Sequence, residues 1–495
     1  MKSESVVIAI DLGTTGNRAI AFSRSGAVVA QAYRKLTQHY PQAGWVEHDP
    51  VELYRTSLSA LQEVVEAVGS EQVHAIGITN QRETTIIWDR ATGQPVHPAI
   101  VWQDRRTAAR CEELHSSLQV VKEKTGLVID PYFSATKITW ILDEIDPDRK
   151  RSSRGDLLFG TPETWVLWQL TNGAVHATEP SNASRTMLFN ITTLDWDDEL
   201  LELFNIPAAL LPQIDDSDTL FGVTDASLFH RSIPIAGIAG DQQASLFGQL
   251  GWDGRTVKAT YGTGIFMLVN TGTTPCFHES LITTVAWKRS SQINYALEGS
   301  LFMGGASIQW LQENLGIIDS PQATGSESIA AARNEGVYFV PAFQGLGAPY
   351  WRPDARALLI GLTRKADRTT VIRAAVEAMA YQVRDVVEAF LPAVGSLPDR
   401  IRADGGATRN DILMQFQADL LGIPVVCSGI METTALGVAG IAGIASGFWS
   451  EKDFAATVTD GRIFSPVPDR DRGLYESYYA GWKRAVERSL DWVEG

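Results

Sequence analysis

Residues 6–22 decide how the chain is interpreted, and they read Val6-Val7-Ile8-Ala9-Ile10-Asp11-Leu12-Gly13-Thr14-Thr15-Gly16-Asn17-Arg18-Ala19-Ile20-Ala21-Phe22. An apolar run, a polar centre and a second apolar run predict a buried strand, a tight turn and another strand. The turn combines a carboxylate suited to a hard cation, a glycine that lets backbone approach an anion, and two hydroxyl donors. Phosphate and magnesium require this combination, but an ordinary solvated hairpin also fits these residues.

The composition indicates a folded protein of more than one domain. A chain of 495 residues exceeds what one hydrophobic core usually supports, so we expect two or three domains. The net charge of −16 argues against a broad nucleic-acid surface, although local donors and a cation can still hold a nucleotide. Cys111, Cys276 and Cys427 are scattered without metal-ligand spacing, which predicts buried, unreactive thiols in a reducing compartment.

No targeting or membrane signal is recognisable in the sequence. Residues 1–5 lead into the first strand without a basic region or a cleavage site, and no apolar run reaches about 18 residues. The nearest candidate, residues 435–449, is short and dominated by glycine and alanine, which predicts a tightly packed interior helix. We therefore expect a cytoplasmic protein.

The first half continues with alternating elements. Residues 26–33 supply a third strand, which completes an antiparallel meander, and a helix capped by Asp49 follows and ends near Gly69. Strands at 73–79 and 85–88 then predict a mixed sheet with sites at the strand ends.

Two later segments of the first half are also interpreted. Residues 105–148 are predicted to be mainly helical. The charged run from Asp146 to Arg154 is predicted to be an exposed loop.

The second half opens with a pattern similar to that of the first. Gly13-Thr14 recurs as Gly262-Thr263 within a strand-like run at 256–270. Two matched residues alone are expected by chance, but their position after a strand near the start of each half suggests a duplicated architecture. A long helix near residues 364–390, capped around Asp367, precedes a strand, a glycine turn and a helix start at 400–410.

Three further motifs carry candidate chemistry. Asp241 follows a strand at a helix start, where it is either a helix cap or an ionised acid able to act as a base. The adjacent Arg82 and Glu83 could bind vicinal hydroxyls while Trp102 covers a carbon skeleton, or they form a surface salt-bridge cluster. The paired glycines within 405–410 permit close approach of a purine or phosphate. A Walker loop and a protein-kinase signature are both missing from the sequence.

Several strings, in the right order over nearly the whole chain, resemble the glycerol kinases of the FGGY carbohydrate kinase family. They are Asp11-Leu12-Gly13-Thr14-Thr15, Gly77 to Thr84, Trp102 to Arg106, Tyr132 to Lys137, Asn182 to Asn190, Gly240 to Gln243, Tyr261 to Gly264, Ser307 to Trp310 and Asp404 to Ala407. The resemblance implies an α/β fold of two ribonuclease-H-like, actin-type ATPase domains with an active-site cleft between them. Residues 1–250 would bind polyol and phosphate, and residues 251–495 would bind the nucleotide.

The activity implied by the resemblance is ATP-dependent phosphorylation of glycerol to sn-glycerol 3-phosphate in glycerol catabolism. Two alternatives are a kinase of another polyol or ketose and an actin- or chaperone-like ATPase, which would need no polyol pocket. ATP, Mg²⁺ and glycerol are the expected ligands, and no nucleic acid or membrane is expected. Family members often form homodimers or homotetramers, although the sequence shows no separate sign of an interface.

The resemblance also implies roles for individual residues. Asp241 would be the catalytic base, and Asp11 and Asp241 would lie near magnesium. The substrate contacts would be Thr14, Arg82, Glu83, Trp102, Tyr132, Asp241, Gln242 and Phe266. The nucleotide contacts would be Thr14, Thr15, Gly16, Arg18, Thr263, Gly305, Gln309, Gly406 and Asn410.

This sequence departs from the family pattern at the opening turn. Glycerol kinases commonly carry glutamine at the position of Leu12 and serines at those of Gly16 and Asn17. We therefore expect altered nucleotide affinity with activity retained. Residues 227–232 lack the Gly-Gly-Arg string linked to inhibition by fructose 1,6-bisphosphate, and the spacing of His230 does not match that of a phosphorylated regulatory histidine, so neither form of regulation is expected.

Overall fold

The first of two large sheets confirms the predicted meander and the mixed strand directions. The computed structural model describes residues 5–325, 335–430, 432–468 and 472–493. The order in this sheet is β13-β14-β5-β1-β2-β3. Its central strand β1 runs parallel to β5 and antiparallel to β2, and β5 is parallel to β14. The bounds are β1 (Val6–Leu12), β2 (Gly16–Phe22), β3 (Val28–Lys35), β5 (Val73–Asn80), β13 (Gly222–Val223) and β14 (Pro234–Gly240).

The second sheet repeats this arrangement, so the predicted duplication is confirmed at the level of topology. Its order is β17-β18-β16-β15-β21-β22-β23, in which β15 is antiparallel to β16 and parallel to β21. The strands β21 and β22 are parallel, and the edge strand β23 is antiparallel, as β13 is in the first sheet. The bounds are β15 (Thr256–Tyr261), β16 (Ile265–Gly272), β17 (Ile282–Arg289), β18 (Gln292–Leu301), β21 (Arg400–Asp404), β22 (Val425–Ser428) and β23 (Asp460–Phe464).

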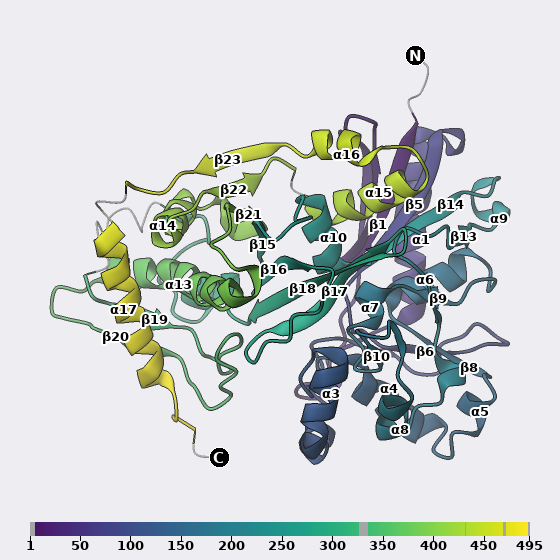
Figure 1. The fold of residues 1–495 in the computed structure, drawn as a ribbon, viewed down its shortest axis with the longest axis horizontal. Helices are drawn as coiled ribbons and strands as arrows, with labels where there is room; N and C mark the ends of the chain where they lie inside the picture. Colours follow the sequence, from purple (N-terminus) through teal and green to yellow (C-terminus); the bar gives the residue numbers. More distant parts are fainter. Residues whose placement is uncertain (1–4, 326–334, 431, 469–471, 494–495) are drawn as a thin grey trace.

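Two helices, α10 (Asp241–Gly248) and α15 (Thr433–Ala445), pack against each other between the sheets (Figure 1). Although α15 belongs to the second half, it lies against β14, β5 and β1 of the first sheet. Glycines permit this approach, since a Cβ on Gly77 would lie 2.6 Å from the Val438 carbonyl oxygen. The predicted interior helix is therefore confirmed, and it joins the two halves.

The other long helices cover the outer faces. The helix α1 (Pro50–Val68) is capped by Asp49 as predicted and packs on β2 and β3. The predicted long helix is α13 (Arg368–Val394), capped by Asp367, and it covers the face of the second sheet opposite to α10. The remaining larger elements of this half are α11 (Gly305–Glu313), α14 (Asp411–Leu421), α16 (Glu451–Thr457), α17 (Arg472–Ser489), β19 (Tyr338–Val340) and β20 (Leu358–Ile360).

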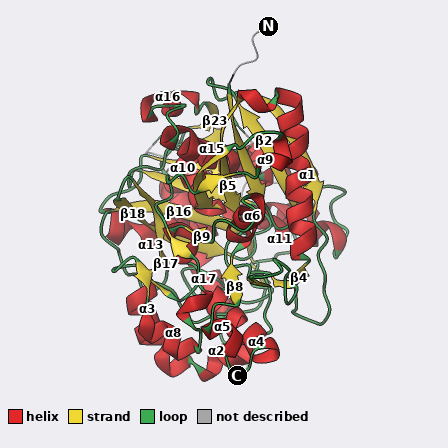
Figure 2. Ribbon diagram, turned by 90° about the vertical axis from the view of Figure 1, so that its right-hand side faces the viewer, coloured by secondary structure: helices red, strands yellow, loops and turns green. Residues whose placement is uncertain are grey.

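The residues between β5 and β13 form a lobe in which short helices gather at the end of the molecule far from α16 (Figure 2). These helices are α2 (Ala108–Glu113), α3 (Leu118–Thr125), α4 (Ser134–Ile145), α5 (Lys150–Ser153) and α8 (Asp198–Phe204). Smaller elements complete the first half, namely β4 (Glu47–His48), β6 (Ile86–Asp89), β7 (Ala99–Ile100), β8 (Leu157–Gly160), α6 (Pro162–Leu170), β9 (Ala177–Thr178), α7 (Pro180–Ala183), β10 (Phe189–Asn190), β11 (Asp195–Trp196), β12 (Gln213–Ile214) and α9 (Ala226–Phe229).

The predicted exposed loop from Asp146 to Arg154 is wrong, because α5 forms within it. The Asp146 carboxylate is buried and accepts hydrogen bonds from the backbone nitrogen and the hydroxyl of Ser152, at 2.8 and 2.7 Å. Asp146 is satisfied by backbone and hydroxyl donors, and Arg151 pairs with the distant Asp89, which a count of charges along the sequence does not reveal.

Two sequence expectations concern the chain as a whole. None of the helices in the described part of the chain is long and apolar enough to cross a membrane. Cys111 and Cys427 are buried and Cys276 is half-buried, and all three are free thiols, as predicted.

Candidate active site

The carboxyl ends of three parallel strands meet at one edge of the first sheet and place the predicted polyol residues together. Thr14 follows β1, Arg82 follows β5, and Asp241 follows β14. They border a cavity of about 50 Å³, enough for a few water molecules or a small polyol. Its lining consists of Thr14, Arg82, Glu83, Trp102, Tyr132, Asp241, Gln242 and Phe266, which are the eight residues expected from the sequence.

Aromatic side chains form one wall of the cavity. The Trp102 ring lies 5.7 Å from that of Tyr132 and 6.3 Å from that of Phe266, both edge to face. The Trp102 indole nitrogen donates to the Thr14 hydroxyl at 2.9 Å, which fixes the orientation of the ring. Because Phe266 lies on β16, the second half contributes part of this wall. Such a wall suits the carbon skeleton of a polyol.

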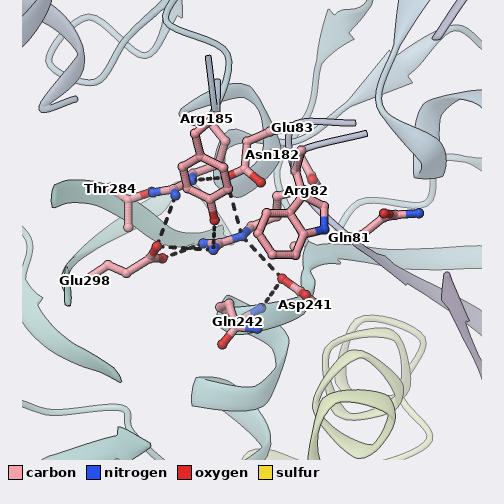
Figure 3. A network of polar contacts seen from close by, with 12 residues as sticks. Gln81, Arg82, Glu83, Asn182, Arg185, Asp241, Gln242, Thr284 and Glu298 are labelled. Atoms are coloured by element: carbon pink, nitrogen blue, oxygen red, sulfur yellow. Dashed lines mark hydrogen bonds and ion pairs between the residues drawn. The ribbon is translucent and has the colours of Figure 1, made fainter. Parts of the chain in front are cut away.

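Charged side chains line another part of the cavity, and Figure 3 shows the network of polar contacts to which they belong. Arg82 Nε lies 3.3 Å from Asp241 Oδ1, and Arg82 Nη2 donates to the Tyr132 hydroxyl at 3.3 Å. Glu83 has a φ of 63°, a left-handed conformation that is uncommon for a residue with a side chain and is typical of functional sites. Arg82 and Glu83 are both buried, so the surface salt-bridge interpretation is wrong.

Two buried residues behind these side chains, Arg185 and Glu298, were not among the predicted site residues. Glu298 on β18 accepts from Arg82 Nη1 at 2.6 Å, and its other oxygen accepts from Arg185 Nη2 at 3.0 Å. Arg185 Nε in turn donates to Glu83 at 2.6 Å. A sequence signal for Glu298 exists, since it is the only charge between Tyr295 and Leu301 in an otherwise apolar or small-residue strand.

The ionisation of these groups follows from their surroundings. Burial alone would raise the pKa of Glu298, but Arg185 and Arg82 outweigh it and hold that pKa at about 2. Burial would lower the pKa of Arg82, but Glu298 and Glu83 keep it well above its usual value. Both groups are therefore charged at neutral pH.

Asp241, which lines the cavity, and Asp11 are the two residues predicted to lie near magnesium. Asp241 is the first residue of α10, its side chain is 30% exposed, and one oxygen accepts from the Gln242 backbone nitrogen at 2.7 Å. Burial raises the pKa of Asp11 to about 7, and Asp241 and Glu432 add to the effect while Arg18 opposes it. Among the described residues, no group of three or more histidine, cysteine or acidic side chains is arranged to hold a metal ion.

The predicted nucleotide residues fall into two groups, one at each sheet. Thr14, Thr15, Gly16 and Arg18 lie at the β1–β2 hairpin. Arg18 forms an ion pair with Glu432, which precedes α15, so this pair joins the two halves.

The second group lies mainly at the corresponding end of the second sheet. The Thr263 carbonyl accepts from the Gly304 backbone nitrogen at 2.8 Å, which seats the start of α11 and Gly305 against the β15–β16 turn. Gly406 begins the short helix after β21, and Asn410 caps α14 while donating to Thr324 at 3.1 Å. Gln309 is exposed on α11 and donates to Glu313 at 2.8 Å.

The three unusual residues of the opening turn differ in where they point. Leu12 is buried in the core of the first half, and Asn17 donates to the Leu53 carbonyl at 3.0 Å and to Thr56 at 2.8 Å. Both side chains are thus engaged on the side of α1. At Gly16, a Cβ would lie 2.5 Å from the carbonyl oxygen of Arg34, so β3 leaves no room for a side chain there.

The comparisons with known proteins agree with this architecture. Residues 6–248 match the N-terminal domain and residues 257–446 the C-terminal domain of the FGGY family of carbohydrate kinases. Glycerol kinase of Aeromonas hydrophila is 51% identical over 99% of this chain and 98% of its own, and glycerol kinase of Aquifex aeolicus is 49% identical over 99% of both chains.

Solved structures show the same relationship. The crystal structure of Plasmodium falciparum glycerol kinase with ADP superimposes with a TM-score of 0.93, at 34% identity over 99% of both chains. A xylulose kinase from Lactobacillus acidophilus shares the fold with a TM-score of 0.86 at 21% identity, over 98% of this chain and 99% of its own. The chain therefore belongs to the FGGY family of carbohydrate kinases.

Proposed function

We propose that this protein is an ATP-dependent glycerol kinase that produces sn-glycerol 3-phosphate and ADP. The observation that carries the proposal is the cavity of about 50 Å³ between an aromatic wall and the Arg82–Glu83 pair, with Asp241 beside it. This size and chemistry suit a three-carbon polyol, and a nucleotide would not fit. The names of the relatives at about 50% identity support the same activity.

Each lining residue has a role in this proposal. Arg82 donates to one hydroxyl of glycerol and Glu83 accepts from its neighbour, while Trp102 and Phe266 cover the carbon chain. Thr14, Tyr132 and Gln242 supply the remaining hydrogen-bonding groups of the cavity. The Asp241 carboxylate accepts the proton of the terminal hydroxyl as that oxygen bonds to the γ-phosphorus, and the bond from phosphorus to ADP breaks.

ATP would bridge the two groups of nucleotide residues. The turn at Thr14, Thr15 and Gly16 would hold the phosphates with Arg18, and Thr263, Gly305, Gln309, Gly406 and Asn410 would hold the rest of the nucleotide. The acidic pair Asp11 and Asp241 fits Mg²⁺, because carboxylate oxygens are its preferred ligands. Burial and the neighbouring Asp241 raise the pKa of Asp11, and a bound cation would offset both effects. When bound, the ion would neutralise charge that develops on the phosphates.

The proposal extends to the organisation of the protein. Residues 1–250 would form the domain that binds polyol and phosphate, and residues 251–495 the domain that binds the nucleotide. We also propose a cytoplasmic location, and assembly as a homodimer or homotetramer like many family members.

A substrate panel tests the proposed activity. ADP release is measured with ATP and Mg²⁺ in the presence of glycerol, other small polyols, ketoses and unfolded protein. The proposal expects a strong preference for glycerol. A preference for a ketose or another polyol would favour a different kinase, and ADP release that ignores all of them but responds to unfolded protein or filament formation would favour an actin- or chaperone-like ATPase.

A further inference from the structure

Behind the polyol cavity lies a buried group of four charged residues, contributed by both halves of the chain (Figure 3). Arg82, Glu83 and Arg185 belong to the first half, and Glu298 lies on β18 of the second. Their side chains are 0–2% exposed. Arg185 and Glu298 do not line the cavity, although each contacts a residue that does.

The four charges are balanced and each is paired. Glu298 accepts from Arg82 through both oxygens, at 2.6 and 3.2 Å, and also from Arg185. Arg185 joins Glu298 to Glu83, so the acids and bases form a closed circuit of two positive and two negative groups. Removing one charge from such a circuit leaves a buried charge of the opposite sign without compensation.

The contacts divide the guanidinium of Arg82 into two edges. Its Nη atoms donate to Glu298 and make longer bonds to Gln243 and Tyr132, while its Nε lies 3.3 Å from Asp241 and 3.8 Å from Glu83. Without Glu298, the nearest carboxylate left to Arg82 on this side is Asp241, the proposed base. A full Arg82–Asp241 pair would occupy the cavity and weaken the base.

We propose that Glu298, together with Arg185, is a positioning residue that fixes Arg82 and Glu83 for polyol binding and holds Arg82 away from full pairing with Asp241. This inference rests on the proposed function, because it assigns a role within the same cavity. Both halves of the chain then form the polyol site, because Glu298 on β18 holds Arg82 in place. Phe266, on the neighbouring strand β16, is contributed from the same face of the second sheet.

The test is the variant Glu298→Gln, which keeps the shape and removes the charge. We expect the KM for glycerol to rise about 100-fold, the size typical of losing one partner of a buried charge pair, while the KM for ATP stays within about threefold. In an Arg82→Ala background the same substitution should add little further increase, because Glu298 acts through Arg82. If Glu298 had only a structural role, Glu298→Gln would raise the glycerol KM in the Arg82→Ala background by the same factor as in the wild type.

Asp385→Asn provides the matched control. Asp385 is also a buried acid of the second half, with hydrogen bonds from Tyr479 at 2.6 Å and Trp482 at 2.8 Å, but it lies in the α13–α17 packing. Its substitution should lower the melting temperature and leave the glycerol KM unchanged. If Glu298→Gln changes both KM values together, or changes neither, the inference is refuted.

A second variant covers the case in which Glu298→Gln does not fold. Glu298→Asp keeps the charge and shortens the reach, so the glycerol KM should rise by a smaller factor, and an unchanged value would refute the inference. The wild-type protein is assayed in parallel. Failure of the wild type to phosphorylate glycerol would refute the proposed function itself. If the wild type is active and the Glu298 variants have an unchanged KM for glycerol, only the positioning role is refuted.

Discussion

Gly437 lies where the helices α10 and α15 cross, and replacing it with alanine should affect both stability and turnover. A Cβ at this position would overlap the Ala244 carbonyl oxygen and would lie 2.6 Å from the carbonyl carbon and 2.9 Å from the Gly248 nitrogen. Since nonbonded heavy atoms prefer about 3.5 Å, the helices must separate by more than about 1 Å. Overpacking of this size costs about 3 kcal/mol and lowers the melting temperature by about 5 °C. Because α10 begins with Asp241, the same shift displaces the proposed base, and kcat should fall by about tenfold or more.

Calorimetry of thermal unfolding measures the melting temperature, and ADP release at saturating glycerol and ATP measures kcat. The matched control is Gly473→Ala in α17, where a Cβ would meet no atom within 4 Å. That substitution should raise stability slightly, because alanine favours a helix more than glycine does. If Gly437→Ala melts at the same temperature as Gly473→Ala and retains full turnover, the packing argument for the α10–α15 crossing is wrong.

Three further predictions concern the site. Asp241→Asn should lower kcat by about two to four orders of magnitude in steady-state assays, and near-normal turnover would remove Asp241 from the proposed mechanism. Arg82→Ala should raise the KM for glycerol and leave nucleotide binding, measured by calorimetry, nearly intact; an unchanged dependence on glycerol would place the polyol elsewhere. The pKa of Asp11 is about 7 in the folded protein and near 4 in the unfolded chain. Between these pH values the folded state holds a proton that the unfolded chain loses. The stability of the ligand-free protein should therefore fall as the pH rises from about 4 to about 7. Chemical denaturation across this range should show the fall in the wild type and not in Asp11→Asn, and parallel curves would contradict it.

Much of the fold could be predicted because its signals are local. The hairpin of β1 and β2 was visible in two apolar runs around a polar turn, and α1 in its cap Asp49 and its helical stripe. The repeat of Gly13-Thr14 at Gly262-Thr263 marked the equivalent hairpin of the second sheet. Charge content misled before α5, where backbone and hydroxyl donors satisfy the buried Asp146 carboxylate.

The resemblance named the residues that line the cavity, and several of these motif residues follow the ends of neighbouring parallel strands. Topology alone then brings Thr14, Arg82 and Asp241 together, whatever the length of chain between them. The resemblance added Tyr132 and Phe266, whose own neighbours in the sequence give no sign of a polyol site. The nucleotide contacts and the magnesium site stay predictions. They require that one ATP molecule, with its magnesium ion, contacts both groups of nucleotide residues.

Arg185 and Glu298 show what such reasoning misses and why. Their roles come from contacts across the chain, and neither touches the cavity, so no spacing rule connects them to Arg82. The physical cost of burying a charge supplies a more general criterion. Glu298 is a buried acid on β18, and the cost of burying its charge is offset by Arg82 and Arg185. Buried charges of opposite sign in different halves are therefore candidates for a contact between the halves, and here that contact lies directly behind the site.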